Sequence, residues 1–210
     1  MKVLIACEYS GAVRDAFIKQ GHDAMSCDLL PTDVDGPHYQ GSVTDILNDG
    51  WDLMIAHPPC TYLAVSGNRW LYNKDGSRNE ERWDNRREAL DFVRLLMNAP
   101  IERIAVENPV SVISSEMRKP DQIIQPWQFG DEAQKTTCLW LKNLPKLKPT
   151  KIVGKGEFVT FKSGKKHPAW YAEAFAKAKT KAERQKLRSK TCPLNTPDAD
   201  DALTRVKHEH

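Results

Sequence analysis

Two apolar segments of strand character each end at a proline-fixed turn that carries a group able to do chemistry. The first, 52–56, runs into His57-Pro58-Pro59-Cys60, and the second, 103–106, runs into Glu107-Asn108-Pro109. Proline fixes φ and holds the preceding residue in an extended conformation, so both turns are stiff. Open α/β sheets bind their ligands at the carboxyl ends of strands. A thiol and a carboxyl group at two such ends predict covalent catalysis.

The chemistry that this pair predicts is addition of a thiolate to an electron-poor ring carbon, with an acid protonating a ring nitrogen. Taken alone, Cys60 could be a small residue buried in the core, and Glu107 could cap the N-terminus of a helix. His57 could help to deprotonate the thiol, although its position more simply shapes the turn. A metal site is conceivable from the potential ligands Cys7, Cys27, His57 and Cys60. Their spacing matches no zinc-binding pattern, so we expect no metal.

The first predicted strand-to-helix turn, 6–14, favours a nucleoside cofactor over a dinucleotide. It contains one glycine, Gly11, whereas a pyrophosphate-binding turn carries three. Asp28, at the end of the second predicted strand, could accept hydrogen bonds from ribose hydroxyls, and Asp45 from an exocyclic amine. Each carboxylate alone equally fits a turn cap. Together with the first turn they predict a pocket for an adenosine-type cofactor.

Strand and helix patterns alternate over the first 142 residues. The predicted strands are 2–6, 24–28, 52–56, 103–106, 122–125 and 137–141, and the predicted helical segments are 12–20, 43–47 and 80–98. This alternation predicts an α/β fold with a mostly parallel sheet, right-handed crossovers and helices on both faces. The long segment 61–79, beside the nucleophile turn, is expected to be a functional loop.

The charge of the chain is unevenly distributed. The formal net charge is +3, yet residues 142–190 contain 15 Lys and Arg against three Glu, so the remainder is acidic. A basic flank on an acidic body fits a polyanion such as DNA, although a solvated Lys-rich helix gives the same pattern.

Targeting and redox features point to a cytoplasmic protein. No apolar run is long enough to span a bilayer, and the N-terminus does not have the form of a signal peptide. The five cysteines are odd in number and include no Cys-x-x-Cys pair, which fits reduced thiols.

The order of these motifs resembles the cytosine-5 DNA methyltransferase family over residues 1–142. The matching segments are Tyr9-Ser10-Gly11 for the cofactor turn, Asp28-Leu29 for ribose, Thr44-Asp45-Ile46 near adenine, Pro59-Cys60-Thr61 for the nucleophile, Glu107-Asn108-Pro109 for the acid, and Phe129-Gly130 through Gln134-Lys135-Thr136. The resemblance implies a Rossmann-like fold, S-adenosylmethionine as methyl donor, and a cytosine flipped out of DNA. It also implies a covalent bond from Cys60 to ring carbon 6, with Glu107 at the ring nitrogen and the methyl group arriving at carbon 5.

The resemblance, together with the basic charge of the segment that follows it, assigns residues to two binding roles. The residues expected to bind the cofactor are Glu8, Tyr9, Ser10, Gly11, Asp28, Leu29, Asp45, Ile46 and Pro58. The residues expected to bind the nucleic acid are Pro59, Asn108, Gln134 and three phosphate-contacting lysines, Lys162, Lys165 and Lys166. The expected host compartment is the cytoplasm of a bacterium or of a phage-infected cell, and restriction protection, phage DNA modification and regulation are equally open as purposes.

The sequence departs from the family at named positions. Val13 and Arg14 replace later glycines of the cofactor turn, Thr61 replaces glutamine, Pro109 replaces valine, and Thr136 and Cys138 replace two arginines. The family also places a recognition domain after the segment ending near Leu141, where about fifty residues here predict a hairpin, 152–161, and a basic helix, 170–189. We therefore expect a minimal enzyme with a catalytic domain, 1–149, a DNA-contacting appendage, 150–190, and a poorly ordered tail, 191–210.

Sequence selection by such an enzyme would come from the hairpin or from the loop 61–79, where Asn68, Arg69 and Trp70 could enter a groove. Three other functions stay open. An amino-methyltransferase uses a related Pro-Pro motif, but His57 and Cys60 occupy the places of its acceptor and its stacking ring. A catalytically idle protein could bind DNA or a protein through its basic flank, and an enzyme could act on RNA or a free nucleotide.

Overall fold

The structure is a computed structural model that describes residues 1–161, 164–180 and 183, and it divides into two compact units. Unit 1 comprises Met1–Ile123 and Thr137–Lys146, and unit 2 comprises Ile124–Thr136 and the chain from Leu147 onward. The proline-fixed turns lie in unit 1, and most of the basic segment lies in unit 2.

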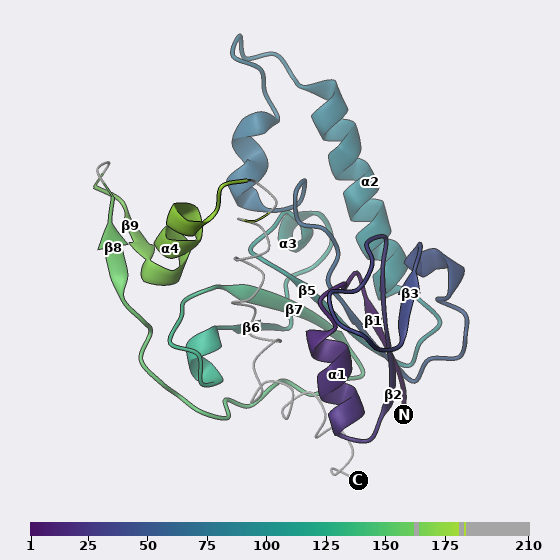
Figure 1. Ribbon diagram of the computed structural model, residues 1–210. Helices are drawn as coiled ribbons and strands as arrows, with labels where there is room; N and C mark the ends of the chain where they lie inside the picture. The colour runs from purple at the N-terminus through teal and green to yellow at the C-terminus, as the bar shows by residue number, and fades with distance from the viewer. Residues whose placement is uncertain (162–163, 181–182, 184–210) are drawn as a thin grey trace. The chain divides into compact units, whose positions relative to one another are not determined.

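Seven strands form one sheet in the order β3-β2-β1-β4-β5-β7-β6 (Figure 1). They are β1 (Lys2–Ala6), β2 (Asp23–Asp28), β3 (His38–Gln40), β4 (Leu53–Ala56), β5 (Arg103–Asn108), β6 (Gln122–Ile124) and β7 (Thr137–Lys142). The pairs β3–β2, β2–β1, β1–β4 and β4–β5 are parallel, and β7 is antiparallel to β5. This arrangement confirms the predicted α/β fold with a mostly parallel, Rossmann-like sheet.

The helical segments of unit 1 connect these strands. They are α1 (Ala12–Lys19), η1 (Val43–Asp45), η2 (Val65–Trp70), α2 (Glu80–Met97) and α3 (Ile113–Glu116). Asn79 caps α2 by accepting a hydrogen bond from the Arg82 backbone N–H at 3.1 Å. Of the helices that the structure describes, none has the length and apolar character needed to cross a bilayer.

Helices cover both faces of the sheet, as predicted. Leu4 and Ala6 of β1 belong to the core cluster that also includes Val93 of α2. Val3 and Ile5 are fully buried but lie outside that cluster, because side chains alternate between faces along a strand. Helix α1 packs against β1 and β2 and covers this second face. A central strand buried on both sides explains its continuous apolar sequence.

Strand β5 is longer than the sequence pattern predicts. The apolar run ends at Val106, but the strand continues through Glu107 and Asn108 because both residues pair with β7, opposite Leu139 and Cys138. The strand β3 and the short helix α3 were not predicted, since neither has a periodic pattern long enough to recognise.

Unit 2 contains η3 (Pro126–Gln128), a hairpin of β8 (Phe158–Thr160) and β9 (Lys166–Pro168), and the helix α4 (Ala169–Lys177). The predicted hairpin over 152–161 is wrong in register, because the turn falls between Phe161 and Lys165, whose backbones pair at 2.9 Å. The preceding residues instead run beside η3, where Val153 N–H donates to the Trp127 carbonyl at 2.9 Å. Much of the predicted helix 170–189, and the predicted tail 191–210, lie outside the described residues.

Candidate active site

The turn after β1 is organised by the buried carboxylate of Glu8. Its Oε1 accepts hydrogen bonds from the Val13 backbone N–H at 2.9 Å and from the Ser10 hydroxyl at 2.8 Å. This oxygen caps α1, whose N-cap residue is Gly11 and has no side chain to do so. The second oxygen, Oε2, is buried and has no partner among the residues that the structure describes. Buried polar atoms are normally paired, so Oε2 retains the capacity to accept a hydrogen bond.

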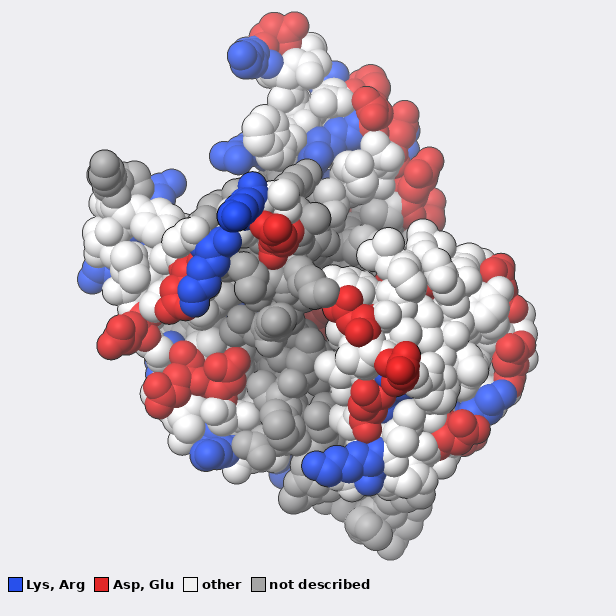
Figure 2. Space-filling view, viewed as in Figure 1, with Lys and Arg blue, Asp and Glu red and all other residues white. Residues whose placement is uncertain are grey.

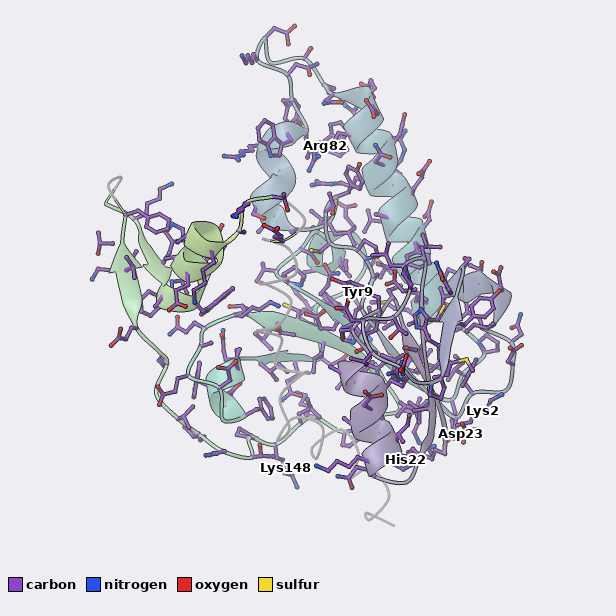
Figure 3. The ribbon with its side chains drawn as sticks, in the orientation of Figure 1. Lys2, Tyr9, His22, Asp23, Arg82 and Lys148 are labelled. Atoms are coloured by element: carbon purple, nitrogen blue, oxygen red, sulfur yellow. The ribbon has the colours of Figure 1, made fainter. Side chains whose placement is uncertain are left out.

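The loop 29–37 lies over this turn and is fastened by Arg14. The Arg14 side chain is fully buried, and its nearest ion-pair partner, Asp15, lies at 2.7 Å and is half exposed. The guanidinium donates four further hydrogen bonds of 3.2 to 3.3 Å, to Ser26 Oγ, Thr32 Oγ1 and the carbonyl oxygens of Val34 and Asp35. The loop also donates from Asp33 N–H to the carbonyl of Tyr9 at 2.8 Å. Figure 3 shows Tyr9 above α1, where the two segments meet.

The single glycine of this turn is required by Arg14. Gly11 has φ +73°, and a Cβ at this position would lie 2.5 Å from Arg14 Nη2 and 2.6 Å from Val34 Cγ2. Gly36 is restricted in the same way, with a Cβ position 2.6 Å from the guanidinium. Arg14 therefore fills the space beside this turn with its own side chain.

The two carboxylates predicted for cofactor binding lie at the same edge of the sheet. Both carboxylates are close enough to the Cys27 thiol for their charges to act on it. Burial is the largest cause that raises the pKa of this thiol to about 11, and the charges of Asp28 and then Asp45 also raise it. Asp28 Oδ1 accepts a hydrogen bond from Leu30 N–H at 2.9 Å, and Asp45 Oδ2 accepts one from the Tyr39 hydroxyl at 3.1 Å. Each carboxylate thus supports a turn and still has a second oxygen.

The apolar residues that follow these carboxylates differ in exposure. Leu29 is 74% exposed, whereas Ile46 is 7% exposed and belongs to the core cluster. Leu29 can therefore contact a ligand with most of its side chain, and Ile46 can offer only an edge.

The nucleophile turn is bonded to the end of β5. Asn108 donates from Nδ2 to the Pro58 carbonyl at 3.0 Å, and the carbonyl of Cys60 accepts from Leu63 N–H at 3.1 Å and Ala64 N–H at 2.9 Å. Pro58 is buried, whereas Pro59 and Cys60 are exposed. The turn is therefore fixed by backbone contacts on its inner side and presents the thiol on its outer side.

The segments that follow the two turns also pair with each other. Val65 N–H donates to the Val110 carbonyl at 3.2 Å, and Val112 N–H donates to the Leu63 carbonyl at 3.0 Å. Ala64 and Ser111 lie opposite each other in an antiparallel bridge. This short ladder holds the Cys60 turn beside the Glu107 turn.

His57 contacts the acid predicted for catalysis. Its Nδ1 lies 3.4 Å from Glu107 Oε2, and the two side chains are 15% and 13% exposed. His57 Nε2, Asn108 Oδ1 and Ser111 Oγ are buried without partners among the described residues. Among the described residues, three buried polar atoms that could still form hydrogen bonds thus lie just beyond the ends of β4 and β5 or within the last residue of β5.

Cys60 is the exposed cysteine among the four that the structure describes. Burial raises the pKa of the Cys7 thiol to about 12, with smaller effects of Asp28 and Cys27. Burial and then the charge of Glu107 raise the pKa of Cys138. Since the thiolate is the reactive form of a cysteine, these buried thiols are poorly reactive, and among the described cysteines Cys60 is the best placed to attack a substrate.

Four of the predicted substrate residues lie in unit 2 or outside the described residues. The backbone carbonyl of Gln134 accepts a hydrogen bond from Trp170 Nε1 at 3.2 Å within that unit. Lys165 and Lys166 are exposed, and Lys166 begins β9. Lys162 lies outside the described residues.

Sequence reasoning missed the role of Arg14 and the contact between His57 and Glu107. An arginine between the apolar residues Val13 and Phe17 has no sequence signal for burial, because helical arginines usually face solvent. His57 had a weak signal, since it follows β4 directly.

Comparisons with known proteins find solved structures of similar fold. No protein-family model and no curated protein matches the sequence. A solved structure described as a candidate DNA modification methyltransferase encoded within a prophage (E. coli) superposes with a TM-score of 0.47 at 15% sequence identity. The match covers 73% of this chain and 52% of that one, so this chain spans about half the length of that protein.

Proposed function

We propose that this chain transfers a methyl group from S-adenosylmethionine to carbon 5 of cytosine in DNA through a covalent adduct with Cys60. The observation that carries the proposal is the bonded pair of turns, which sets an exposed thiol beside the strand end that bears Glu107. A thiol and an acid held by neighbouring strands suit attack on a ring that becomes more electrophilic when its nitrogen is protonated.

The residues act on the cytosine ring in two stages. Cys60 loses its thiol proton to water and forms a sulfur–carbon bond at carbon 6, while Glu107 gives a proton to ring nitrogen 3. The electron pair of the 5,6 double bond then becomes available at carbon 5, which takes the methyl group and leaves S-adenosylhomocysteine as the product. After methylation the proton at carbon 5 leaves to water, the sulfur–carbon bond breaks, and Glu107 recovers its proton from nitrogen 3. His57 holds the Glu107 carboxyl group in position through the 3.4 Å contact.

The residues at the first three strand ends fit S-adenosylmethionine, which when bound supplies an electrophilic methyl group. The buried, unpaired Oε2 of Glu8 suits the ammonium group of the methionine moiety. Asp28 suits the ribose hydroxyls, Asp45 suits the adenine amine, and Leu29 suits the face of the base. The remaining contacts that we assign to this cofactor are Tyr9, Ser10, Gly11, Ile46 and Pro58.

Nucleic-acid contacts complete the proposal. Pro59 is exposed beside Cys60, and the unpaired Oδ1 of Asn108 suits a donor on the target base. We assign Gln134, Lys162, Lys165 and Lys166 to the polynucleotide, where the lysines would contact phosphates and make binding sensitive to salt.

Covalent trapping tests the function. DNA that contains 5-fluorocytosine, mixed with the chain and S-adenosylmethionine, should give a complex that survives denaturing electrophoresis, because fluorine cannot leave carbon 5 as a proton does. Cys60→Ser should abolish the complex, and Cys138→Ser, which changes a buried thiol, should retain it. Salt-sensitive DNA binding with no adduct would reject the enzyme and indicate a binding protein. An adduct with RNA alone would reject DNA as the substrate.

A further inference from the structure

Arginine and aromatic side chains alternate on the segment that follows Cys60 and on the first turns of α2. We call this the arginine–aromatic surface, and it consists of Tyr62, Arg69, Trp70, Tyr72, Arg78, Arg82, Trp83 and Arg86. Four guanidinium groups lie over aromatic rings at 4.5 to 5.6 Å from the ring centroids, in the pairs Arg69–Trp70, Arg78–Trp83, Arg82–Tyr62 and Arg86–Trp83. Tyr72 meets Trp83 edge to face at 6.3 Å.

This surface is fixed to the nucleophile turn. Arg82 donates from Nη2 to the Thr61 carbonyl at 3.2 Å, and Arg86 donates from Nε to the Tyr62 carbonyl at 3.0 Å. Arg86 also donates from Nη2 to Asn68 Oδ1 at 2.6 Å. Figure 3 shows Arg82 between η2 and α2. The surface thus begins two residues after Cys60, at Tyr62, and its hydrogen bonds to the Thr61 and Tyr62 carbonyls fix it to that turn.

Positive charge on this surface is poorly neutralised. The exposed carboxylates of α2 follow a different stripe of the helix, at Glu81, Asp84, Glu88 and Asp91, and Figure 2 shows them as a red band along the outer edge of α2. Two carboxylates act on the surface: Glu80 lies 3.5 Å from Arg78, and the charge of Glu116 acts on Arg86. Burial and the neighbouring charge of Arg82 lower the pKa of Arg86, as expected where cations crowd together.

Two buried donors on the surface lack acceptors. Arg82 Nε and Trp83 Nε1 have no hydrogen-bond partner among the residues that the structure describes. Buried N–H groups are rarely left unpaired, and acceptors such as phosphate oxygens satisfy them. Trp70 and Tyr72 are 55% and 52% exposed, although large rings usually bury most of their area. The surface therefore offers donors for anions and open rings for flat ligands.

We infer that the arginine–aromatic surface binds an unpaired nucleic-acid strand, with phosphates at the arginines and bases stacked on Trp70 and Tyr72, and so delivers a single-stranded cytosine to Cys60. This inference deepens the proposed function by naming the form of its substrate. Strand-binding proteins combine positive grooves with aromatic platforms in this way. A base in a duplex has both faces stacked on its neighbours, so only an unpaired base can cover an exposed ring.

Direct binding tests the inference without relying on catalysis. In a Cys60→Ala chain, a fluorescent single-stranded oligonucleotide should bind more tightly than the same sequence as a duplex, measured by fluorescence anisotropy at two salt concentrations. Trp70→Ala and Tyr72→Ala should each weaken single-strand binding by roughly 5- to 100-fold, the effect of losing one stacked base. Trp70→Phe should restore most of the affinity. Arg94→Gln, on the same helix but outside the surface, should leave it unchanged.

The outcomes separate the inference from the proposed function. Unchanged single-strand affinity in Trp70→Ala and Tyr72→Ala, or tighter binding of the duplex, would overturn the inference even if Cys60 forms its adduct. Altered self-association without altered oligonucleotide binding would also overturn it and would indicate a protein partner. Weakened binding in both variants supports the inference even if no methyl transfer is detected.

Discussion

Asn108 donates a hydrogen bond from Nδ2 to the carbonyl oxygen of Pro58 at 3.0 Å, although the two residues are 50 positions apart in the chain. Asn108 is 1% exposed, so this bond is shielded from water. Pro58 lies two residues before Cys60, and Glu107 directly precedes Asn108. The end of one strand, β5, therefore positions both the acid and the turn that carries the thiol.

Removing this bond should impair chemistry more than folding. Asn108→Ala leaves the Pro58 carbonyl without its donor, and we expect the free energy of unfolding to fall by about 1–3 kcal/mol. Adduct formation with 5-fluorocytosine should slow by a larger factor than S-adenosylmethionine binding weakens. Urea unfolding and the rate of adduct formation measure the two effects. Asn98→Ala, which removes an exposed bond to the Arg94 carbonyl, is the control and should change both little.

The contact between His57 and Glu107 should appear as an energetic coupling. In a double-mutant cycle with His57→Gln and Glu107→Gln, the second substitution should cost less once the first is present, by about 0.5–3 kcal/mol in the barrier to adduct formation. His38→Gln combined with Glu107→Gln is the control and should be additive, because His38 bonds Ser26 at the other edge of the sheet. Additive effects of His57 and Glu107 would contradict the positioning role.

Thiol reactivity should single out Cys60. With iodoacetamide at pH 8, in a Cys192→Ser chain, peptide mapping should find Cys60 modified first. The pKa values of Cys7 and Cys27 are raised to about 12 and about 11, so both thiols hold their protons at this pH. In urea all four thiols should react at similar rates. Modification of Cys27 in the folded chain as fast as that of Cys60 would refute the assignment.

The same pKa shifts make stability depend on alkaline pH. Burial raises the pKa of Cys27 from 9.0 to about 11, so the folded chain retains a proton that the unfolded chain releases. This contribution to stability is present below pH 9 and is lost as the pH rises from 9 towards 11. Urea unfolding at pH 8 and pH 10 should therefore show a smaller loss of stability in Cys27→Ala than in the unsubstituted chain. Equal losses would contradict the raised pKa.

Arg14 should matter for both stability and cofactor affinity. Arg14→Met removes the hydrogen bonds that fasten the loop 29–37, and we expect the free energy of unfolding to fall by several kcal/mol, about 3 or more. Calorimetric titration should show weaker S-adenosylmethionine binding even in variants that remain folded, such as Arg14→Lys. Lys19→Met, on the exposed end of the same helix, should change neither quantity. Unchanged cofactor affinity in Arg14→Lys would show that the loop is not part of the pocket.

The fold could be predicted from the sequence because its strands are continuous apolar runs separated by amphipathic helices. Val3–Ile5 and Leu53–Ala56 are buried on both faces of the sheet. Short, continuous apolar runs of this kind are typical of the buried strands of a parallel sheet. The hairpin of unit 2 was misplaced because glycines at 154 and 156 resemble turn residues. Gly156 instead lies against Glu132, whose carbonyl oxygen is 2.1 Å from the position that a Cβ would occupy.

The candidate site could be predicted in part. Prolines beside Cys60 and Glu107 identify both turns, since proline restricts the backbone in any context. The hydrogen bond from Asn108 to Pro58 and the buried position of Arg14 could not be foreseen, because both depend on contacts between residues far apart in the chain. The sequence left open whether Trp70 and Tyr72 are exposed or pack into the core, as aromatic rings more often do, and in the structure both are exposed.

Strands β4 and β5 are parallel, and Ala56 of β4 lies opposite Val106 of β5. This register allows correct folding of the chain to be checked. Side chains alternate sides along a strand, so a shift of one residue between these strands would turn Glu107 to the opposite side of the sheet. A compact chain with these two strands misaligned would keep its helices and much of its buried apolar area. Glu107, however, would then lie on the side of the sheet away from Cys60. Adduct formation with fluorocytosine therefore reports correct strand alignment as well as chemistry, and it distinguishes native from near-native molecules in the same sample.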